Sequence, residues 1–577
     1  MSTPPIPDNP INTGRKLLQD WLAAQPTNFF TTDRHLQRSL EFYWGHDLYR
    51  QHAGRLYEFG HLSATALAEA VRQAEHDLAL PRLTRFNQIG QRTEEVAFHP
   101  SHHEAGRIIY GSGMMSVYAD PGQNLLSLAL FFLSSLNGEA GHNCPVACTA
   151  GLIKLLQQAG SPELKERYLP RLLDPNYDSH YNGAQFLTEI QGGSDVGANG
   201  TVAVPYDETD GRWLLRGEKW FCSNVTAHLA LVTARVSGQG EGTRGLGLFL
   251  LTRHFEDGTP NRITIRRLKE KLGTRSMASG ELEFHDALVY QVGPVKDGFK
   301  NVMTHVINTS RLYNAVGVCA NARRAHFVGW SYAQHRMAFG QPIIHFPAVQ
   351  ETLAQMRADT AAMMAGSWHI VHTLDQMELG QADEAMAQFW RMAVNLNKYR
   401  TAVLGHGVIL QAIELLGGNG TIEDFSVLPR LLRDNVVYEN WEGTHNVLLA
   451  QVQRDMRRYQ LHLPFIAHLR RLLDRLATPE LPAEMGESLR QIEAEIELVL
   501  AMDPLTAAIY FRPLMDRLTD LFYAACLAVE GDWEYLEKED KSKRRLAVFY
   551  FNRRVAGRAA HQIHYYDDQV SRLSSEV

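Results

Sequence analysis

A change of pattern that occurs twice along the chain constrains its fold more than any other sequence feature. Residues 1–185 are mostly helical in pattern, and the stretch 120–159 is apolar around nearly its whole helical circumference. Residues 185–295 are instead rich in Gly, Thr and Val and contain short alternating runs, and helical periodicity returns at Gly298. A β-rich block between two helical blocks predicts the α+β class, with a compact central barrel or sandwich.

Turn and helix-breaking residues divide the 577-residue chain into four parts. In the β-rich block we expect strands at 213–216, 228–235, 246–252, 263–265 and 281–284. In the last part Pro464, Pro504 and Pro513 are expected to open or divide helices. The predicted domains are an N-terminal helical domain (1–185), a central β-domain (186–297), a C-terminal four-helix-bundle domain (298–458) and a helical C-terminal extension (459–577).

Composition narrows the class of protein. The net charge of −7 argues against a chain that binds nucleic acid with its whole surface, and five Cys cannot form a disulfide framework. Residues 1–10 show neither a basic n-region nor an apolar h-region, so no secretory signal is visible. The longest strongly apolar run, 125–136, is too short to span a bilayer. We therefore expect a soluble, cytoplasmic protein without a membrane span.

Two motifs in the β-rich block suggest a bound planar ligand. Residues 187–196 contain paired glycines and hydroxyl side chains, which let backbone N–H groups approach a planar or anionic ligand closely. Residues 217–224 place Trp220 shortly before Ser223, so that an indole could stack on a flat heterocycle and a hydroxyl could bond to it. Taken alone, the first motif is more typical of an ordinary Gly-rich turn, and the second is equally compatible with core aromatics of a barrel.

Two further motifs lie in the helical region that follows. Arg336 and Phe339 are expected at positions i and i+3 of one helix face, where a guanidinium suits a diphosphate and a phenyl ring offers a stacking surface. A glycine-rich run, 417–420, ends a later helix. Glu442 then follows Trp441 and precedes a glycine. Desolvation by such neighbours raises the pKa of a carboxyl group toward the range useful for a general base.

The order and spacing of these four motifs, over residues ~100–455, resemble the acyl-CoA dehydrogenase superfamily of flavoproteins. Segment 271–276 and Arg311 are further matches. The resemblance implies the fold of that family, FAD as cofactor, an acyl-CoA substrate and its α,β-dehydrogenation in fatty acid metabolism. It also implies an electron acceptor such as electron-transferring flavoprotein, and a homo-oligomer, normally a tetramer built as a dimer of dimers.

The resemblance also assigns roles by position. Glu442 matches the base that removes the α-proton while the β-hydrogen leaves as hydride to flavin N5. Some members carry the base directly before the conserved Arg, where this chain has Ser310, which cannot serve. Cys222 stands beside the usual hydroxyl position, so either Cys222 or Ser223 is expected to contact the flavin. Substrate contacts fall on Ser194, Arg311 and Gly443, and FAD contacts on Leu187, Thr188, Gly193, Ser194, Trp220, Phe221, Cys222, Ser223, Arg336, Phe339, Gly417, Gly418, Thr444 and Asn446.

The extra length places the chain near one branch of the family. Its N-terminal region and the segments 141–145, 220–224 and 441–446 resemble the longer AidB-like subgroup, which has been linked to DNA protection through a basic C-terminal region. Residues 451–577 carry 18 Lys and Arg against 20 Asp and Glu, which disfavours that role. The acid-free stretch 541–558 keeps DNA binding as a second hypothesis, against the simpler view that its charges pair with neighbours.

Two other possibilities are less favoured. A flavin oxidase or monooxygenase on the same fold often replaces the Glu base with Asp, so Glu442 argues against it. Cys144 and Cys148, with His142 nearby, could be half of a metal site, but no matching pair occurs elsewhere. We therefore interpret the two cysteines as buried helical residues and expect no metal.

Overall fold

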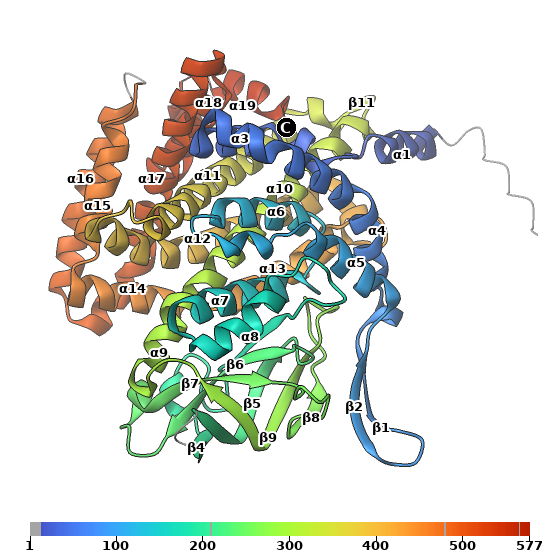
Figure 1. Ribbon diagram of the computed structural model, residues 1–577. Helices are drawn as coiled ribbons and strands as arrows, with labels where there is room; N and C mark the ends of the chain where they lie inside the picture. The colour runs from blue at the N-terminus through green and yellow to red at the C-terminus, as the bar shows by residue number, and fades with distance from the viewer. Residues whose placement is uncertain (1–12, 208–210, 478–480, 565, 577) are drawn as a thin grey trace, which may run out of the picture.

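The computed structural model describes residues 13–207, 211–477, 481–564 and 566–576. Residues 1–10, in which no secretory signal is visible, lie outside these ranges. Figure 1 shows helices above a sheet domain, with the chain passing from one to the other and back. The helical, sheet and helical parts follow one another in the order expected from the sequence.

The N-terminal part is helical, as predicted, and its most apolar helices lie deepest. Every residue of α6 is buried, because this helix has no polar face to expose. Ser161 caps the helix that begins at Pro162, with its hydroxyl accepting from the N–H of Leu164. The helices are α1 (Thr13–Ala23), α2 (Phe29–Thr32), α3 (Arg34–Ala64), α4 (Ala66–Ala74), α5 (Pro100–Gly111), α6 (Asn124–Ser135), α7 (Asn143–Ala159) and α8 (Pro162–Leu172).

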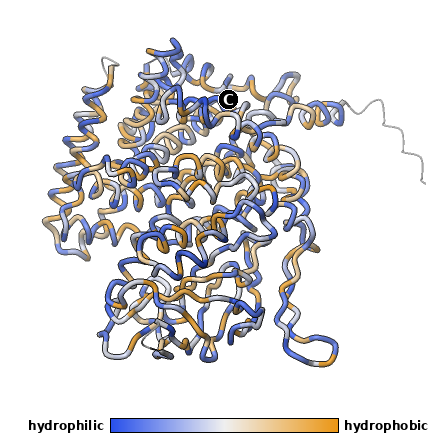
Figure 2. Tube along the Cα trace, viewed as in Figure 1, coloured by the Kyte–Doolittle hydropathy of each residue, from blue (hydrophilic) through white to orange (hydrophobic). Residues whose placement is uncertain are grey.

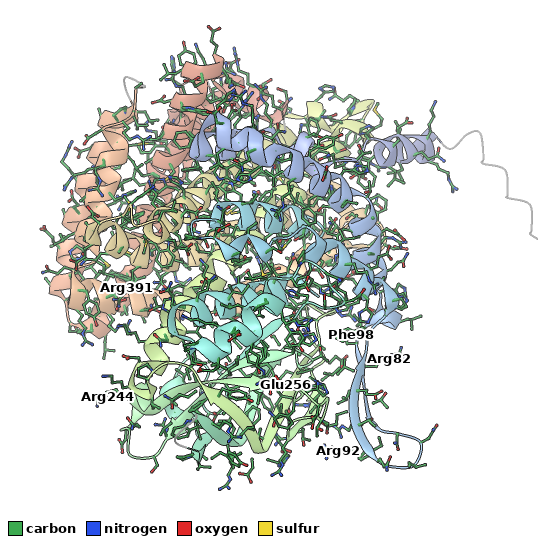
Figure 3. The ribbon with its side chains drawn as sticks, in the orientation of Figure 1. Arg82, Arg92, Phe98, Arg244, Glu256 and Arg391 are labelled. Carbon is green, nitrogen blue, oxygen red and sulfur yellow. The ribbon has the colours of Figure 1, made fainter. Side chains whose placement is uncertain are left out.

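A hairpin of β1 (Arg82–Phe86) and β2 (Arg92–Ala97) interrupts these helices and was not predicted. Figure 3 shows Arg82 and Arg92 on this arm and Phe98 at its root. Both strands are mostly exposed, so neither has the one-sided apolar alternation of a half-buried strand. The root is held by Phe98, which packs against the apolar core of the sheet domain, and by the Glu94 carboxylate, which accepts from the N–H of Ile265 at 2.5 Å.

The central sheet is a barrel, one of the two forms expected. Its pairings close a ring in the order β6, β4, β5, β9, β7 and back to β6, with β3 and β8 attached to β6 and β9. A closed ring removes the exposed edges of a flat sheet. All five predicted strands are present among β3 (Gly183–Phe186), β4 (Val202–Asp207), β5 (Arg212–Ser223), β6 (Leu229–Val236), β7 (Leu246–Thr252), β8 (Ile263–Leu268) and β9 (Ser279–Gln291).

The bundle that follows is built on three long helices, α10, α11 and α12, which pack along one another. By length and hydropathy alone, 384–421 could cross a membrane, but α12 within it packs against α10, α11, α13, α14, α15 and α17 of the protein. The elements are α9 (Gly298–Asn301), α10 (Asn308–His335), β10 (Met337–Ala338), β11 (Gln341–Pro342), α11 (Pro347–Glu378), α12 (Glu384–Leu416), α13 (Leu428–Asn440) and α14 (His445–Tyr459).

The C-terminal extension is an integral part of the helical body. Its helices alternate between hydrophilic and hydrophobic residues, as helices with one packed face do (Figure 2). Pro504 begins α17 as predicted, but Pro513 does not divide it: the helix continues through this residue. Packing of α17 along α11 outweighs the lost hydrogen bond. The extension comprises α15 (His462–Leu473), α16 (Leu481–Ala501), α17 (Pro504–Lys538), α18 (Ser542–Tyr550) and α19 (Tyr566–Ser574).

Candidate active site

Glu442 lies in the short connection between α13 and α14, in an uncommon backbone conformation. Its φ is +57°, and that of Gly443 is +103°. A side chain at Gly443 would strain the backbone, whereas a glycine adopts this φ freely. A non-glycine residue in the left-handed region costs on the order of 1–3 kcal/mol, so neighbouring contacts must hold Glu442 there.

Two buried cations hold the carbonyl groups of this connection. Arg311 on α10 donates from Nε to the carbonyl of Glu442 at 3.0 Å. Lys398 on α12 donates from Nζ to the carbonyls of Gly443 at 2.8 Å and Glu439 at 2.9 Å. The substrate contact predicted for Arg311 stays a prediction; in the structure its guanidinium holds the backbone of the expected base.

The Glu442 carboxylate is enclosed, although the residue as a whole keeps some exposed surface. Its Oε1 accepts from Nε2 of Gln185, on β3, at 2.6 Å. Burial raises the pKa of Glu442 to about 7, against the opposing effects of Arg311, Lys398 and the Gln185 hydrogen bond. A carboxylate that titrates near neutrality can accept a proton at physiological pH, which is what a general base requires.

A small pocket opens beside this carboxylate. Helices α6, α7, α10 and α13 supply its walls, and Ser310 lies in the wall next to Glu442. Phe131 and Tyr313 lie against each other at 4.7 Å between ring centroids, and both line the pocket. Cys144 and Cys148 line it as well, so these thiols are buried pocket residues. Within the part of the chain that the structure describes, no group of three or more His, Cys, Asp or Glu residues could hold a metal ion.

The two motifs of the β-rich block meet at the barrel rim. The N–H of Trp220 donates to the carbonyl of Thr188 at 2.8 Å. Beneath them Lys219 and Glu189 form a buried ion pair, 2.6 Å between Nζ and Oε1. Leu187 and Thr188 are half-buried, while Gly193 and Ser194 are exposed beside them. Backbone groups, hydroxyls and an indole thus share one rim, a donor set that fits a flat, hydrogen-bonding heterocycle such as a flavin ring.

Within the second motif the structure separates the two alternatives. Cys222 is fully buried in the barrel core, where its Sγ donates to the carbonyl of Lys219 at 3.6 Å. The Cys222 side chain therefore does not face the rim, and the expected thiol contact with a flavin is wrong. Ser223, the neighbour on the opposite side of the strand, is half-buried, and Phe221 is exposed.

The third motif is not helical, contrary to expectation. Helix α10 ends at His335, and Arg336 leads into the tight β10–β11 hairpin. Phe339 occupies the turn with φ +49° and 97% of its surface exposed. Because 25 residues of helical chain rise by roughly 37 Å, Arg336 lies far from Arg311 and Glu442 of the same chain.

The remaining predicted residues lie at two helix ends. Gly417, with φ +59°, ends α12, and Gly418 follows it with open space where a side chain would stand. Thr444 caps α14 without a side-chain bond, and Asn446 Oδ1 accepts from Nη2 of Arg512 on α17 at 2.6 Å. The structure thus brings Glu442, Gly443 and Arg311 together, and places Arg336, Phe339, Gly417 and Gly418 elsewhere.

Sequence reasoning missed two residues of the site, Gln185 and Lys398. Gln185 lies on β3, two residues before the first motif, where nothing distinguishes it from an ordinary polar residue. Lys398 had a signal: it is one cation within the largely apolar stretch of α12, and it is fully buried. A buried lysine requires a compensating partner, which could have marked it as a candidate.

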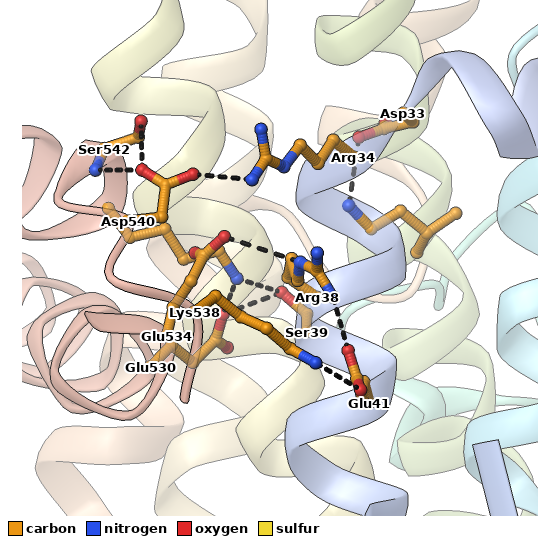
Figure 4. Close-up of polar contacts among 12 residues, drawn as sticks. Asp33, Arg34, Arg38, Ser39, Glu41, Glu530, Glu534, Lys538, Asp540 and Ser542 are labelled. Carbon is orange, nitrogen blue, oxygen red and sulfur yellow. Dashed lines mark hydrogen bonds and ion pairs between the residues drawn. The ribbon is translucent and has the colours of Figure 1, made fainter. Parts of the chain in front are cut away.

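The basic stretch 541–558 is occupied by internal ion pairs. Five of its seven cations contact carboxylates of the described chain, and Figure 4 shows the neighbouring network that joins α17 and α18 to α3. The pairs are Lys543–Glu530 (2.5 Å), Arg544–Asp532 (2.5 Å), Arg553–Glu351 (3.5 Å), Arg554–Asp359 (2.5 Å) and Arg558–Glu484 (3.0 Å). Paired charges attract phosphate weakly, so this arrangement favours the structural interpretation of the stretch.

Helical, barrel and bundle parts in this order, with a buried carboxylate at their junction, define the class of acyl-CoA dehydrogenase-type oxidoreductases. Three family models match consecutive parts of the chain: the adaptive response protein AidB N-terminal domain at 22–179, the acyl-CoA dehydrogenase middle domain at 184–287, and the acyl-CoA dehydrogenase C-terminal domain at 296–457. The chain belongs to the acyl-CoA dehydrogenase family, in its AidB-like subgroup.

Individual relatives agree with this assignment. Acyl-CoA dehydrogenase family member 11 of Caenorhabditis elegans is 32% identical over 74% of this chain and 70% of its own. Putative acyl-CoA dehydrogenase AidB of Escherichia coli (strain K12) is 32% identical over 65% of this chain and 69% of its own. The structure of C. elegans ACDH-11 in complex with C11-CoA has a TM-score of 0.83 and 27% identity, covering 90% of each chain.

Proposed function

We propose that this protein is an FAD-dependent acyl-CoA dehydrogenase in which Glu442 removes the α-proton of an acyl-CoA thioester. The observation that carries the proposal is the enclosed Glu442 carboxylate, whose pKa of about 7 suits a base, beside a pocket between helices. The C11-CoA complex of the C. elegans relative supports a thioester as substrate, and family membership supports FAD.

The residues of this chain divide the work as follows. Thr188, Trp220 and Ser223 would hold the ring of FAD, which supplies a hydride acceptor when bound. Glu442 takes the α-proton onto its carboxylate, and Arg311 keeps its backbone in place. An α-C–H of a thioester is a far weaker acid than Glu, so hydrogen bonds to the thioester carbonyl must supply several kcal/mol; the Glu442 N–H is the candidate donor from this chain.

The decisive test is Glu442→Gln, titrated anaerobically with a panel of acyl-CoAs while flavin absorbance is followed. We expect bleaching to slow by about 10³-fold or more, because the amide cannot accept the proton. FAD should stay bound. The matched control is Asp375→Asn: Asp375 is also a buried carboxyl with a raised pKa, about 6, but it caps α6 away from the pocket. Normal bleaching of the Glu442→Gln protein would contradict the assignment.

An assembly of at least two chains follows from the same proposal. Arg336 and Phe339 lie too far from Glu442 to serve the FAD of their own chain, and Phe339 is almost wholly exposed. We propose that they contact the FAD of a neighbouring subunit, within a tetramer. Phe339→Ala should then lower FAD affinity without lowering the thermal midpoint of the apoprotein, as ligand titration and calorimetry would measure. Unchanged FAD affinity would contradict the proposed contact of Phe339 with the FAD of a neighbouring subunit.

Electron-transferring flavoprotein as acceptor, a cytoplasmic location and a role in fatty acid metabolism remain proposals on the same basis. DNA binding is the less favoured alternative, because most cations of the stretch 541–558 form ion pairs with carboxylates of the same chain. It requires salt-dependent duplex binding that weakens when Arg545 and Lys541 are neutralised.

A further inference from the structure

Lys398 is a fully buried lysine that no carboxylate of the described residues contacts. Its side chain, on α12, is 0% exposed, and Nζ uses two of its three donors on the carbonyls of Glu439 and Gly443. Buried ammonium groups are normally compensated by a direct ionic partner, because removal from water is costly. Among the described residues Lys398 has only carbonyl partners at hydrogen-bond distance, and they flank Glu442 on both sides.

We propose that Lys398 is a positioning residue for Glu442, fixing the connection between α13 and α14 through its carbonyls and placing a positive charge beside the base. The inference rests on the proposed function for its catalytic meaning. The effect of Lys398 on the position and the pKa of Glu442 does not depend on any substrate.

The first part of the argument is geometric. Glu442 and Gly443 both have left-handed φ values, so this connection relaxes unless its peptide groups are held. Arg311 holds the carbonyl of Glu442, and Lys398 holds the next carbonyl along the chain. Two successive carbonyls fixed from α10 and α12 determine the orientation of the Glu442 N–H and side chain. A shift of about 1 Å at a reacting group can cost roughly 10²-fold in rate.

The second part is electrostatic. Burial lowers the pKa of Lys398 to about 7, with Glu442 opposing this effect, and Lys398 in turn opposes the rise in the pKa of Glu442. The other charged or titratable groups facing the pair are Arg311 on α10, Cys148 on α7, and Glu439 and His445 on the flanking helices. Arg311, like Lys398, lowers the pKa of Glu442. Removing the lysine charge therefore raises the pKa of Glu442.

Two variants separate geometry from charge. Lys398→Met removes both the donors and the charge; Lys398→Gln removes the charge but keeps an amide donor, on a slightly shorter side chain. The matched control is Lys154→Met, because Lys154 is also a largely buried lysine but pairs with Glu378 at 2.5 Å, six residues along α7 beyond the pocket residue Cys148. Thermal unfolding of all three confirms that each protein is folded.

Two measurements are made on each variant. The first is the pH dependence of flavin bleaching by acyl-CoA in the holoprotein. The second is a titration of the apoprotein followed by infrared difference spectroscopy of the carboxyl stretch, with Glu442→Gln identifying the Glu442 band. The second readout needs no substrate, so it still tests the inference if no acyl-CoA bleaches the flavin and the proposed function fails.

For Lys398→Met we expect bleaching at pH 7 to fall by about 10²-fold and the Glu442 midpoint to rise by at least half a pH unit. Lys398→Gln should show the same midpoint shift with a smaller loss of rate, about tenfold. Lys154→Met should leave the midpoint unchanged. If the Lys398→Met midpoint stays at the wild-type value in the infrared titration, the lysine is only a structural residue and the inference is overturned. If Lys398→Met fails to fold, Lys398→Gln decides in the same way.

Discussion

Two glutamate–lysine arrangements, one in the barrel and one in the bundle, consist of the same residue types but shift the pKa of the glutamate in opposite directions. In the barrel, Glu189 and Lys219 touch at 2.6 Å and are both buried. Burial raises the pKa of Glu189, but Lys219 outweighs it and the net pKa is lowered. In the bundle, Lys398 donates to backbone carbonyls on either side of Glu442, and the pKa of Glu442 rises to about 7. Contact produces a permanent ion pair, whereas separation produces a group that titrates.

The largest effect should come from breaking the barrel pair. Glu189→Gln leaves the buried Lys219 ammonium without its partner, which costs about 3–5 kcal/mol of unfolding free energy. Denaturant unfolding of the holoprotein would measure it. The double variant Glu189→Gln/Lys219→Met removes both charges and should recover most of that loss. If Glu189→Gln were as stable as the wild type, the direct contact between Glu189 and Lys219 would not stabilise the fold.

The equivalent change in the bundle should have the opposite sign. The ordinary pKa of a glutamate is 4.5, and that of Glu442 is about 7 when folded, so the ionised carboxylate opposes folding. Stability is unaffected below pH 4.5, falls as pH rises toward 7, and stays reduced above it. Glu442→Gln should therefore gain up to about 3 kcal/mol at pH 8 and nothing at pH 4. Unfolding curves at the two pH values test this, and a loss at pH 8 would contradict the raised pKa.

How far the sequence predicts these two regions differs for a physical reason. Glu189 and Lys219 lie within motifs recognisable by local spacing, and strands such as β6 and β7 follow from their apolar residues. Lys398 reaches Glu442 from another helix, and only packing of α12 against α13 and α14 brings them together. The β1–β2 hairpin was missed because its stability comes from docking on the barrel, and Arg336 and Phe339 were placed on a helix because a tight hairpin after α10 has no periodic signal.

The titrating carboxylate should also control the pH profile. Glu442 is competent only when ionised, so kcat/KM should rise with pH through about 7 and level off above it. Between pH 8 and pH 6 we expect a fall of roughly tenfold. Initial rates with one acyl-CoA across this range would measure it, with unfolding checked at each pH. A flat profile would show that proton removal by Glu442 does not limit the rate.

The smallest effect should come from a pair that has contact without burial. Glu69 and Arg72 on α4 form two hydrogen bonds, 2.9 and 2.7 Å, but their side chains are 52% and 68% exposed. Glu69→Gln should change the unfolding free energy by only about 0.3–0.5 kcal/mol, since water and salt screen the pair. The comparison with Glu189→Gln, measured in the same denaturant, isolates burial as the cause of the difference. A loss above about 2 kcal/mol would mean that contact alone suffices, and the contrast between Glu189 and Glu442 would then need another explanation.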